Sequence, residues 1–222
     1  SCSPHKETGV FIAYPEKGPE SHRLLMLTGY LGAQSSDADL EFPFSMEDEH
    51  ELNHVGLSAA QLPEHYICIH PGASTFSKCW PPHRFAQIAD ALSQESDLPV
   101  VLTGSAQERE LTDLVASQMR TPAINAASPI SIGAMAALIS RSRLLICNDT
   151  GVSRIAAGLK LPSVVIFNTA DMRRWAPANR ALHCCIREGD HHWPMLHCKD
   201  VHSHRHLMSL GHLLIFEWKS VQ

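Results

Sequence analysis

The sequence has 222 residues, of which 44% are hydrophobic and 18% charged, a balance typical of a folded globular protein and not of a disordered one. Its formal net charge of −5 comes without a basic block, which argues against a nucleic-acid partner, because such partners are bound by clustered Lys and Arg. No apolar run approaches the roughly 18 residues of a membrane-spanning helix, and the N-terminus lacks the pattern of a signal peptide.

The first part of the chain shows only weak structural patterns. Residues 9–14 predict a short strand, and residues 21–32 predict a helix. An acidic stretch without clear periodicity follows at 34–52, and its composition is typical of a surface connection between structural units. We therefore expect residues 36–62 to be a linker that follows a unit at residues 1–35, which the family resemblance described below implies to be the remnant of a domain.

From residue 66 onward, strand-like and helix-like segments alternate. Short apolar runs predict strands at 66–70, 98–104, 122–127, 143–147, 163–168 and 181–186. Helical spacing of apolar residues predicts helices at 84–96, 106–119, 132–142 and 150–159. This alternation is typical of a parallel sheet covered on both faces, so we expect residues 63–186 to form a Rossmann-like, doubly wound α/β domain. In such a domain, ligands bind beyond the carboxyl ends of the strands.

The turn at 70–81 carries groups that suit a phosphorylated ligand. Its small residues allow close approach of the backbone, Ser74 and Thr75 offer hydroxyls, and Lys78 supplies a positive charge. A solvated loop with an incidental Lys is the alternative interpretation of the same residues.

The turn at 103–108 has two interpretations of a similar kind. Ser105 followed three residues later by Glu108 is the pattern of an ordinary capping box at a helix start. A carboxylate at the end of a strand is also placed to accept hydrogen bonds from sugar hydroxyls.

The segment Asp149-Thr150-Gly151 joins a buried strand to a helix. If Asp149 or Thr150 caps that helix, the N–H groups of Thr150, Gly151 and Val152 point into the ligand crevice. A helix N-terminus favours a phosphate by roughly 0.3–2 kcal/mol, which is too little without further donors such as Lys78. An ordinary cap is again the alternative. An aspartic protease is excluded because its Asp-Thr-Gly turn belongs to an all-β domain.

Other nucleotide and hydrolase motifs are missing from the sequence. No G-x-G-x-x-G follows a strand and no G-x-x-x-x-G-K-[ST] occurs, which disfavours a dinucleotide or P-loop site. There is also no G-x-S-x-G nucleophile elbow of a hydrolase.

Residues 187–222 form a His-rich connection followed by an apolar stretch that predicts a docking helix at 207–221. Imidazole and thiolate are zinc ligands, but the spacing here matches no zinc finger, so we expect a polar surface connection and no specific metal site. The residues concerned are His191, His192, His197, Cys198, His202, His204 and His206.

The cysteines predict a reducing environment. There are seven of them, an odd number, and Cys68 and Cys147 lie within strand-like runs, where a free thiol behaves as a small apolar side chain. The sequence also begins without Met, so we expect it to be a trimmed or excised piece of a longer protein.

Several segments, taken in this order, resemble glycosyltransferase family 9: IHPGASTFSKCWPPHRFAQIADAL, VVLTGSAQERE, AALISRSRLLICNDTGVSRIAAGLKLPSVVIFN and RRWAP. The resemblance is strong over residues 64–180 and weaker over 18–62. The family includes the lipopolysaccharide heptosyltransferases, which use ADP-L-glycero-D-manno-heptose. Its GT-B architecture places two Rossmann-like domains across a cleft. The resemblance implies that this chain holds the C-terminal, nucleotide-sugar-binding half and only the end of the acceptor-side domain.

The resemblance also implies a role for each strand-end residue. Lys78 and Asp149 would be catalytic as well as donor-binding. Residues 173–175 would lie near the edge of the donor site. Ser74 and Lys78 would contact the donor's phosphates with Thr75 beside them, Glu108 its nucleoside, and Asp149, Thr150 and Gly151 the diphosphate and sugar, with Arg154 as a further donor contact.

The sequence departs from the family pattern in two places. Arg154 stands where the family usually has His, and a permanently charged, forked guanidinium would strengthen phosphate binding and alter the sugar preference. The family's catalytic base is a carboxylate near the start of the N-terminal domain, and nothing before residue 18 resembles that segment. We therefore expect donor binding by this chain, with turnover depending on a base that the chain as given lacks.

The implied reaction is an inverting, metal-independent transfer of a sugar without a cofactor. The expected donor is ADP-heptose, and the expected acceptor is the lipopolysaccharide core or another glycan. The expected location is the cytoplasm, with at most a peripheral association at the inner face of the cytoplasmic membrane. Two alternatives stay open: a non-catalytic or truncated nucleotide-sugar-binding module, and another GT-B enzyme with a different nucleotide sugar, such as a UDP-sugar transferase or an epimerase.

Overall fold

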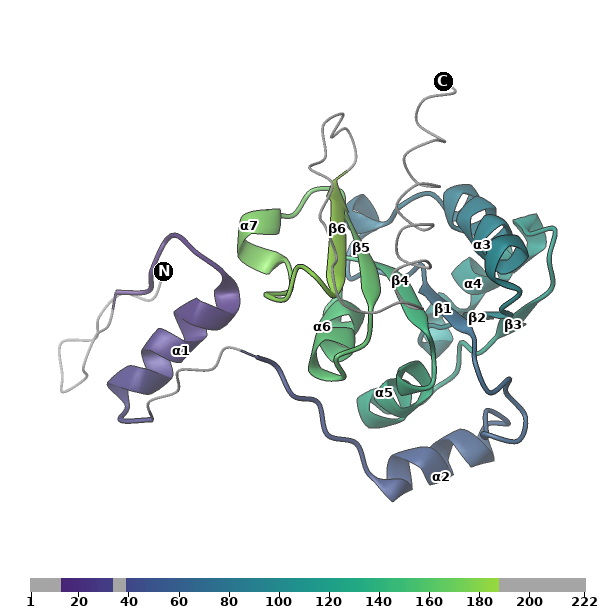
Figure 1. The fold of residues 1–222 in the computed structure, drawn as a ribbon, viewed down its shortest axis with the longest axis horizontal. Coiled ribbons are helices and arrows are strands. Elements are labelled where there is room, and N and C mark those ends of the chain that lie inside the picture. The colour runs from purple at the N-terminus through teal and green to yellow at the C-terminus, as the bar shows by residue number, and fades with distance from the viewer. Residues whose placement is uncertain (1–12, 34–38, 188–222) are drawn as a thin grey trace.

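A computed structural model describes residues 13–33 and 39–187 of the chain (Figure 1). Its centre is a six-stranded sheet in the order β3-β2-β1-β4-β5-β6, in which every neighbouring pair is parallel. The prediction of a Rossmann-like, doubly wound α/β fold is therefore confirmed. The strands are β1 (Ile67–His70), β2 (Val100–Leu102), β3 (Ala123–Asn125), β4 (Leu144–Asn148), β5 (Ser163–Phe167) and β6 (His183–Arg187).

The strand order reverses between β1 and β4. From β1 the chain proceeds to β2 and β3 on one side, whereas β4, β5 and β6 follow on the other side. His70 at the end of β1 pairs with Cys147 near the end of β4, so the loops that leave these two strands start side by side. In an open parallel sheet, this switch point is where ligands bind.

Helices cover both faces of the sheet (Figure 1). On one face, α3 (Pro82–Ser96) and α4 (Arg109–Gln118) pack against the side chains of Ile67 and Ile69. On the other face, α5 (Ile132–Ser140) and α6 (Gly151–Gly158) pack in the cluster that contains Cys68. Because both faces are buried, the strands are continuously apolar, as the sequence pattern predicts.

The acidic stretch that we predicted to be a surface connection contains a helix, α2 (Met46–His54). The Ser45 N–H donates to Asp48 Oδ2 at 2.7 Å and the Asp48 N–H donates back to Ser45 Oγ at 3.4 Å, which forms a capping box. Leu52 is fully buried against the sheet cluster, and the Ser131 N–H before α5 donates to Glu51 Oε1 at 2.7 Å. A single buried leucine among acidic residues leaves no helical periodicity, which is why the pattern missed this helix.

The helix α1 (Glu20–Tyr30) lies to one side of the sheet, near the short helix α7 (Met172–Trp175) (Figure 1). Arg174 Nε in α7 donates to Glu20 Oε2 in α1 at 2.6 Å. Two short 3-10 turns, η1 (Phe76–Lys78) and η2 (Ala106–Glu108), complete the described elements. No helix among these residues is long and apolar enough to cross a membrane.

Parts of the sequence prediction fall outside the described residues. These are most of the strand expected at 9–14, the His-rich connection and the docking helix expected at 207–221. The division of the chain into four segments stays a prediction.

Candidate functional site

A pocket of about 390 Å³ opens at the carboxyl ends of β1 and β4, at the switch point of the sheet. The loops after β1, β2 and β4, the start of α6 and the end of α7 build it. Its lining residues are His70, Ala73, Ser74, Lys78, Glu108, Asp149, Thr150, Gly151, Arg154 and Trp175.

Asn148, the last residue of β4, holds the loop after β1 in place. Its side chain is fully buried. Asn148 Nδ2 donates to the carbonyl oxygens of Pro71 at 2.7 Å and Gly72 at 3.3 Å, and Asn148 Oδ1 accepts from the Trp80 N–H at 3.0 Å. The side-chain amide of Asn148 thus binds both ends of the loop and fixes the position of Lys78 relative to β4.

Lys78 and Asp149 form the charged centre of the pocket. Lys78 Nζ lies 3.4 Å from Asp149 Oδ2. The Asp149 side chain is buried whereas that of Lys78 is partly exposed, and both line the pocket. An ammonium in this position offers its remaining N–H groups to an incoming anion.

Glu108 closes the side of the pocket next to β2. Its Oε2 accepts from the Ser105 N–H and from Ser105 Oγ, both at 2.8 Å, so the predicted capping box is present. Glu108 Oε1 lies against Gly72, where a Cβ atom would collide with it. The same carboxylate therefore caps η2 and lines the pocket, so the two interpretations of this turn are compatible.

The start of α6 supplies backbone groups at the base of the pocket. Thr150 is the N-cap residue, and its Oγ1 accepts from the Val152 N–H at 3.2 Å. The Val152 N–H, which we expected to face the ligand, is therefore used by the cap. A Cβ atom at Gly151 would meet no atom within 4 Å, so the space next to its backbone is open.

Arg154 lies one turn further along α6, against Trp175 of α7. A guanidinium N–H of Arg154 donates to the Trp175 carbonyl, and Cζ lies 5.6 Å from the centre of the indole ring. Burial lowers the pKa of Arg154 from its ordinary value, although the nearby Asp149 opposes that shift. Arg154 stays charged at neutral pH, because the ordinary pKa of a guanidinium lies far above 7.

His70 was not singled out by the sequence, although it lines the pocket. It is buried, and its Nδ1 lies 3.3 Å from Thr103 Oγ1. Burial lowers its pKa below the usual 6.5, with the Glu108 carboxylate opposing the shift. The imidazole is therefore neutral at pH 7. Its place at the end of β1, next to the switch point, is the signal that could have identified it.

The structure brings together every predicted donor-binding residue except Thr75. Thr75 is exposed and its Oγ1 lies 3.4 Å from Ser77 Oγ. Among the residues implied near the edge of the site, Trp175 lines the pocket, Arg174 contacts Glu20, and Arg173 is exposed. Within residues 13–33 and 39–187, no three His, Cys, Asp or Glu side chains are grouped to hold a metal ion.

The strand order and the pocket at the switch point define a Rossmann-like domain with a polar ligand site. A family model described as glycosyltransferase family 9 (heptosyltransferase) matches residues 21–205. The chain therefore belongs to this family, as the sequence motifs indicate.

Curated relatives agree with this assignment. Over 123 residues, 54% of this chain and 36% of the relative, the sequence is 32% identical to lipopolysaccharide heptosyltransferase 3 of Escherichia coli (strain K12). It is 27% identical over 140 residues to lipopolysaccharide heptosyltransferase 1 of Pseudomonas aeruginosa, covering 63% of this chain and 38% of the relative. The matched part thus spans little more than a third of these relatives.

Solved structures share the fold. A family 9 glycosyl transferase from Veillonella parvula DSM 2008 matches with a TM-score of 0.68 and 20% identity, covering 94% of this chain and 62% of that one. The E. coli heptosyltransferase WaaC, solved with ADP, matches with a TM-score of 0.55 and 17% identity, covering 75% and 49%. The fold of this chain therefore corresponds to part of a GT-B heptosyltransferase.

Proposed function

We propose that this chain carries the donor-binding part of a heptosyltransferase, which transfers heptose from ADP-heptose to a lipopolysaccharide core acceptor. The observation that carries the proposal is the pocket at the switch point, where two cationic and two acidic side chains meet the N-terminus of α6. These side chains are Lys78, Arg154, Asp149 and Glu108. A relative of the same fold is solved with ADP, and the curated relatives are named heptosyltransferases.

In the proposed complex, Lys78 and Arg154 bind the donor's diphosphate together with the amides at Thr150 and Gly151. Ser74 donates a hydroxyl from the loop that Asn148 anchors. Glu108, with its Oε2 already committed to Ser105, offers Oε1 to hydroxyl groups of the nucleoside. Asp149 holds Lys78 in position and lies next to the transferred sugar.

The proposed chemistry is an inverting transfer in which an acceptor hydroxyl attacks the anomeric carbon and the nucleoside diphosphate departs. Negative charge builds on the leaving diphosphate, and Lys78 and the amides of α6 are already oriented to stabilise it. Removing one such oriented donor typically raises a barrier by about 2.7–4 kcal/mol. The base that takes the acceptor's proton is expected in a part of the heptosyltransferases that lies outside the match to this chain.

The proposal includes a location at the inner face of the cytoplasmic membrane, where a nucleotide-sugar donor and a lipid-linked acceptor meet. A binding module without transferase activity, or a GT-B enzyme with another nucleotide sugar, is the competing proposal. Each predicts a different pattern of nucleotide binding and turnover.

Calorimetric titration of the chain with ADP, UDP and GDP tests donor binding. We expect selective binding of ADP that is lost in Asp149→Ala. Preference for UDP or GDP would support another nucleotide sugar, and no binding by a folded chain would contradict the proposal. Transfer is then measured with the full-length protein, where Lys78→Ala is expected to lower kcat at least a hundredfold. Selective ADP binding without transfer would favour the binding module.

A further inference from the structure

Two guanidinium groups lie next to the indole ring of Trp175. Arg154 Cζ is 5.6 Å and Arg174 Cζ is 4.8 Å from the centre of the ring. Arg154 comes from α6 and lines the pocket, whereas Arg174 shares α7 with the tryptophan. Two positive charges next to one ring repel each other, and each guanidinium has an acidic neighbour: Asp149 for Arg154 and Glu20 for Arg174.

The anion next to Arg174 is Glu20, the first residue of α1. Its Oε2 accepts from Arg174 Nε at 2.6 Å and from an N–H of Arg23 at 3.1 Å, and its Oε1 accepts from the Tyr14 hydroxyl at 2.5 Å. The hydrogen bond from Arg174, followed by that from Tyr14, lowers the pKa of Glu20 to about 2. Glu20 is therefore charged at any physiological pH.

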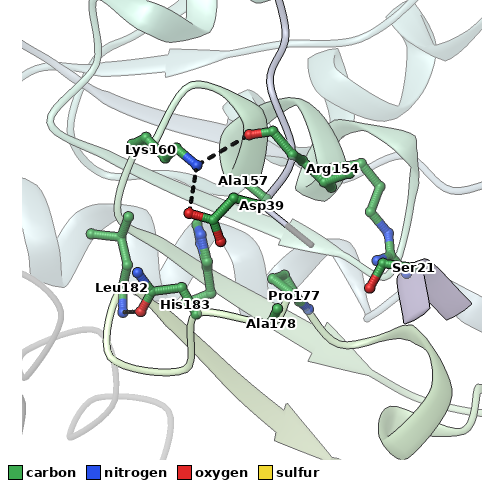
Figure 2. A pocket seen from close by; sticks show the side chains of 11 residues that line it. Ser21, Asp39, Arg154, Ala157, Lys160, Pro177, Ala178, Leu182 and His183 are labelled. Atoms are coloured by element: carbon green, nitrogen blue, oxygen red, sulfur yellow. Dashed lines mark hydrogen bonds and ion pairs between the residues drawn. The ribbon is translucent and has the colours of Figure 1, made fainter. Parts of the chain in front are cut away.

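Arg154 also lies near the start of α1. Besides the pocket, it lines a small cavity of about 30 Å³ that includes Ser21 of α1. Figure 2 shows the Arg154 side chain extending from α6 toward Ser21. The Arg154 guanidinium is therefore bound to α7 and shares a cavity with the start of α1.

We propose that Glu20 is a positioning residue, which fixes the Arg154 guanidinium in the donor pocket by holding Arg174 and Trp175. The inference rests on the proposed binding of a nucleoside diphosphate by Arg154. It adds that donor affinity depends on where α1 lies, because the N-terminal end of α1 carries the carboxylate that binds Arg174. Loss of that anion leaves Arg174 free to move, and Trp175 and Arg154 lose their fixed support.

The first test compares Glu20→Gln with Glu16→Gln by calorimetric titration with ADP. Both variants remove one negative charge, but Glu16 is exposed and lies before α1. We expect Glu20→Gln to raise the Kd for ADP about two- to tenfold and Glu16→Gln to leave it unchanged. Glu20→Asp, which keeps the charge, is expected to restore part of the affinity. Equal Kd values for Glu20→Gln and Glu16→Gln would overturn the proposal.

The second test separates positioning from a general loss of structure. In an Arg154→Ala background, Glu20→Gln is expected to cause no further loss of ADP affinity, because the group through which it acts is gone. Losses that simply multiply would overturn the proposal.

The proposal stays testable if the chain fails to bind ADP, an outcome that contradicts the proposed function itself. Urea unfolding of the wild type, Glu20→Gln, Arg154→Ala and the double variant then measures the coupling between positions 20 and 154. Non-additive changes in the free energy of unfolding would support the connection, and additive changes would overturn it.

Discussion

The backbone at Gly72 lies directly against the Glu108 side chain, with no room for a Cβ atom between Gly72 Cα and Glu108 Oε1. The two residues come from the loops after β1 and β2, whose strands are neighbours in the sheet. The close contact allows a single carboxylate to cap η2 and to line the pocket.

Gly72→Ala is therefore expected to push Glu108 away from Ser105 and into the pocket. We expect weaker ADP binding and a loss of about 0.5–2 kcal/mol in the free energy of unfolding, the usual cost of a lost cap, because the flexible end of Glu108 moves away from the new Cβ atom. Urea unfolding and calorimetry measure the two effects. In a Glu108→Ala background, Gly72→Ala should cause no further loss of stability, because the side chain that its Cβ would meet is gone. A further loss in that background would show that the clash is not with Glu108.

Asn148→Ala is expected to loosen the loop that carries Ser74 and Lys78. The substitution leaves the buried Trp80 N–H and two carbonyl oxygens without their partner. Unpaired buried groups of this kind cost about 1–3 kcal/mol each, although relaxation of the loop reduces the sum. We expect a loss of about 2–4 kcal/mol in urea unfolding, together with weaker ADP binding. Asn53→Ala, at an exposed position of α2, is the control and should change neither.

The sequence predicted the fold because its strands are buried on both faces and alternate with amphipathic helices at regular intervals. It indicated Ser74, Lys78, Glu108, Asp149 and Thr150 as candidates because polar residues at strand ends converge on one edge of a parallel sheet, while their roles came from the family resemblance. Which strand ends are neighbours depends on the strand order, and periodicity carries no information on that order. The switch point between β1 and β4 is what brings the Lys78 and Asp149 loops together.

The sequence analysis missed His70, Asn148 and the helix α2, because what gives them their roles does not show in a local pattern of residues. His70 and Asn148 are the last residues of apolar strands, and nothing local separates a terminal polar residue with a structural role from one that lines a site. The contacts of Asn148 reach the loop more than sixty residues earlier in the chain. The helix α2 was missed because its stability comes from a capping box and one buried leucine rather than from an apolar stripe.

His183 is expected to make the stability of the domain depend on pH between about 6.5 and 4. It is buried at the start of β6 with its Nδ1 2.8 Å from Ser163 Oγ, and burial, with Arg180 and Lys160 nearby, lowers its pKa from 6.5 to about 4. As pH falls through this range, the unfolded chain binds a proton at His183 that the folded chain does not. The free energy of unfolding is therefore not reduced by His183 above pH 6.5, and it decreases by about 3 kcal/mol as pH falls from 6.5 to 4.

Urea unfolding at several pH values tests this. His183→Gln should be less sensitive to pH over that range, whereas His50→Gln, at an exposed position of α2, should keep the slope of the wild type. Burial also lowers the pKa of His70, so a smaller slope of the same sign is expected to persist in His183→Gln. Equal slopes in the wild type and His183→Gln would show that another group titrates.

Arg154→His introduces the residue that the family resemblance leads us to expect at this position, and it is expected to separate affinity from stability. Histidine lacks the length to reach the Trp175 carbonyl and is mostly neutral at pH 8, so the diphosphate loses a cation. We expect the Kd for ADP to rise about tenfold, the loss of one charge-assisted hydrogen bond, and its dependence on salt to become weaker. Burial disfavours the guanidinium in the folded chain, as its lowered pKa indicates, so the free energy of unfolding should not fall by a comparable amount.

Arg173→Ala removes an exposed charge from the neighbouring helix and controls for net charge. If Arg154→His and Arg173→Ala weaken ADP binding equally, Arg154 acts only through long-range electrostatics and not as a contact of the donor.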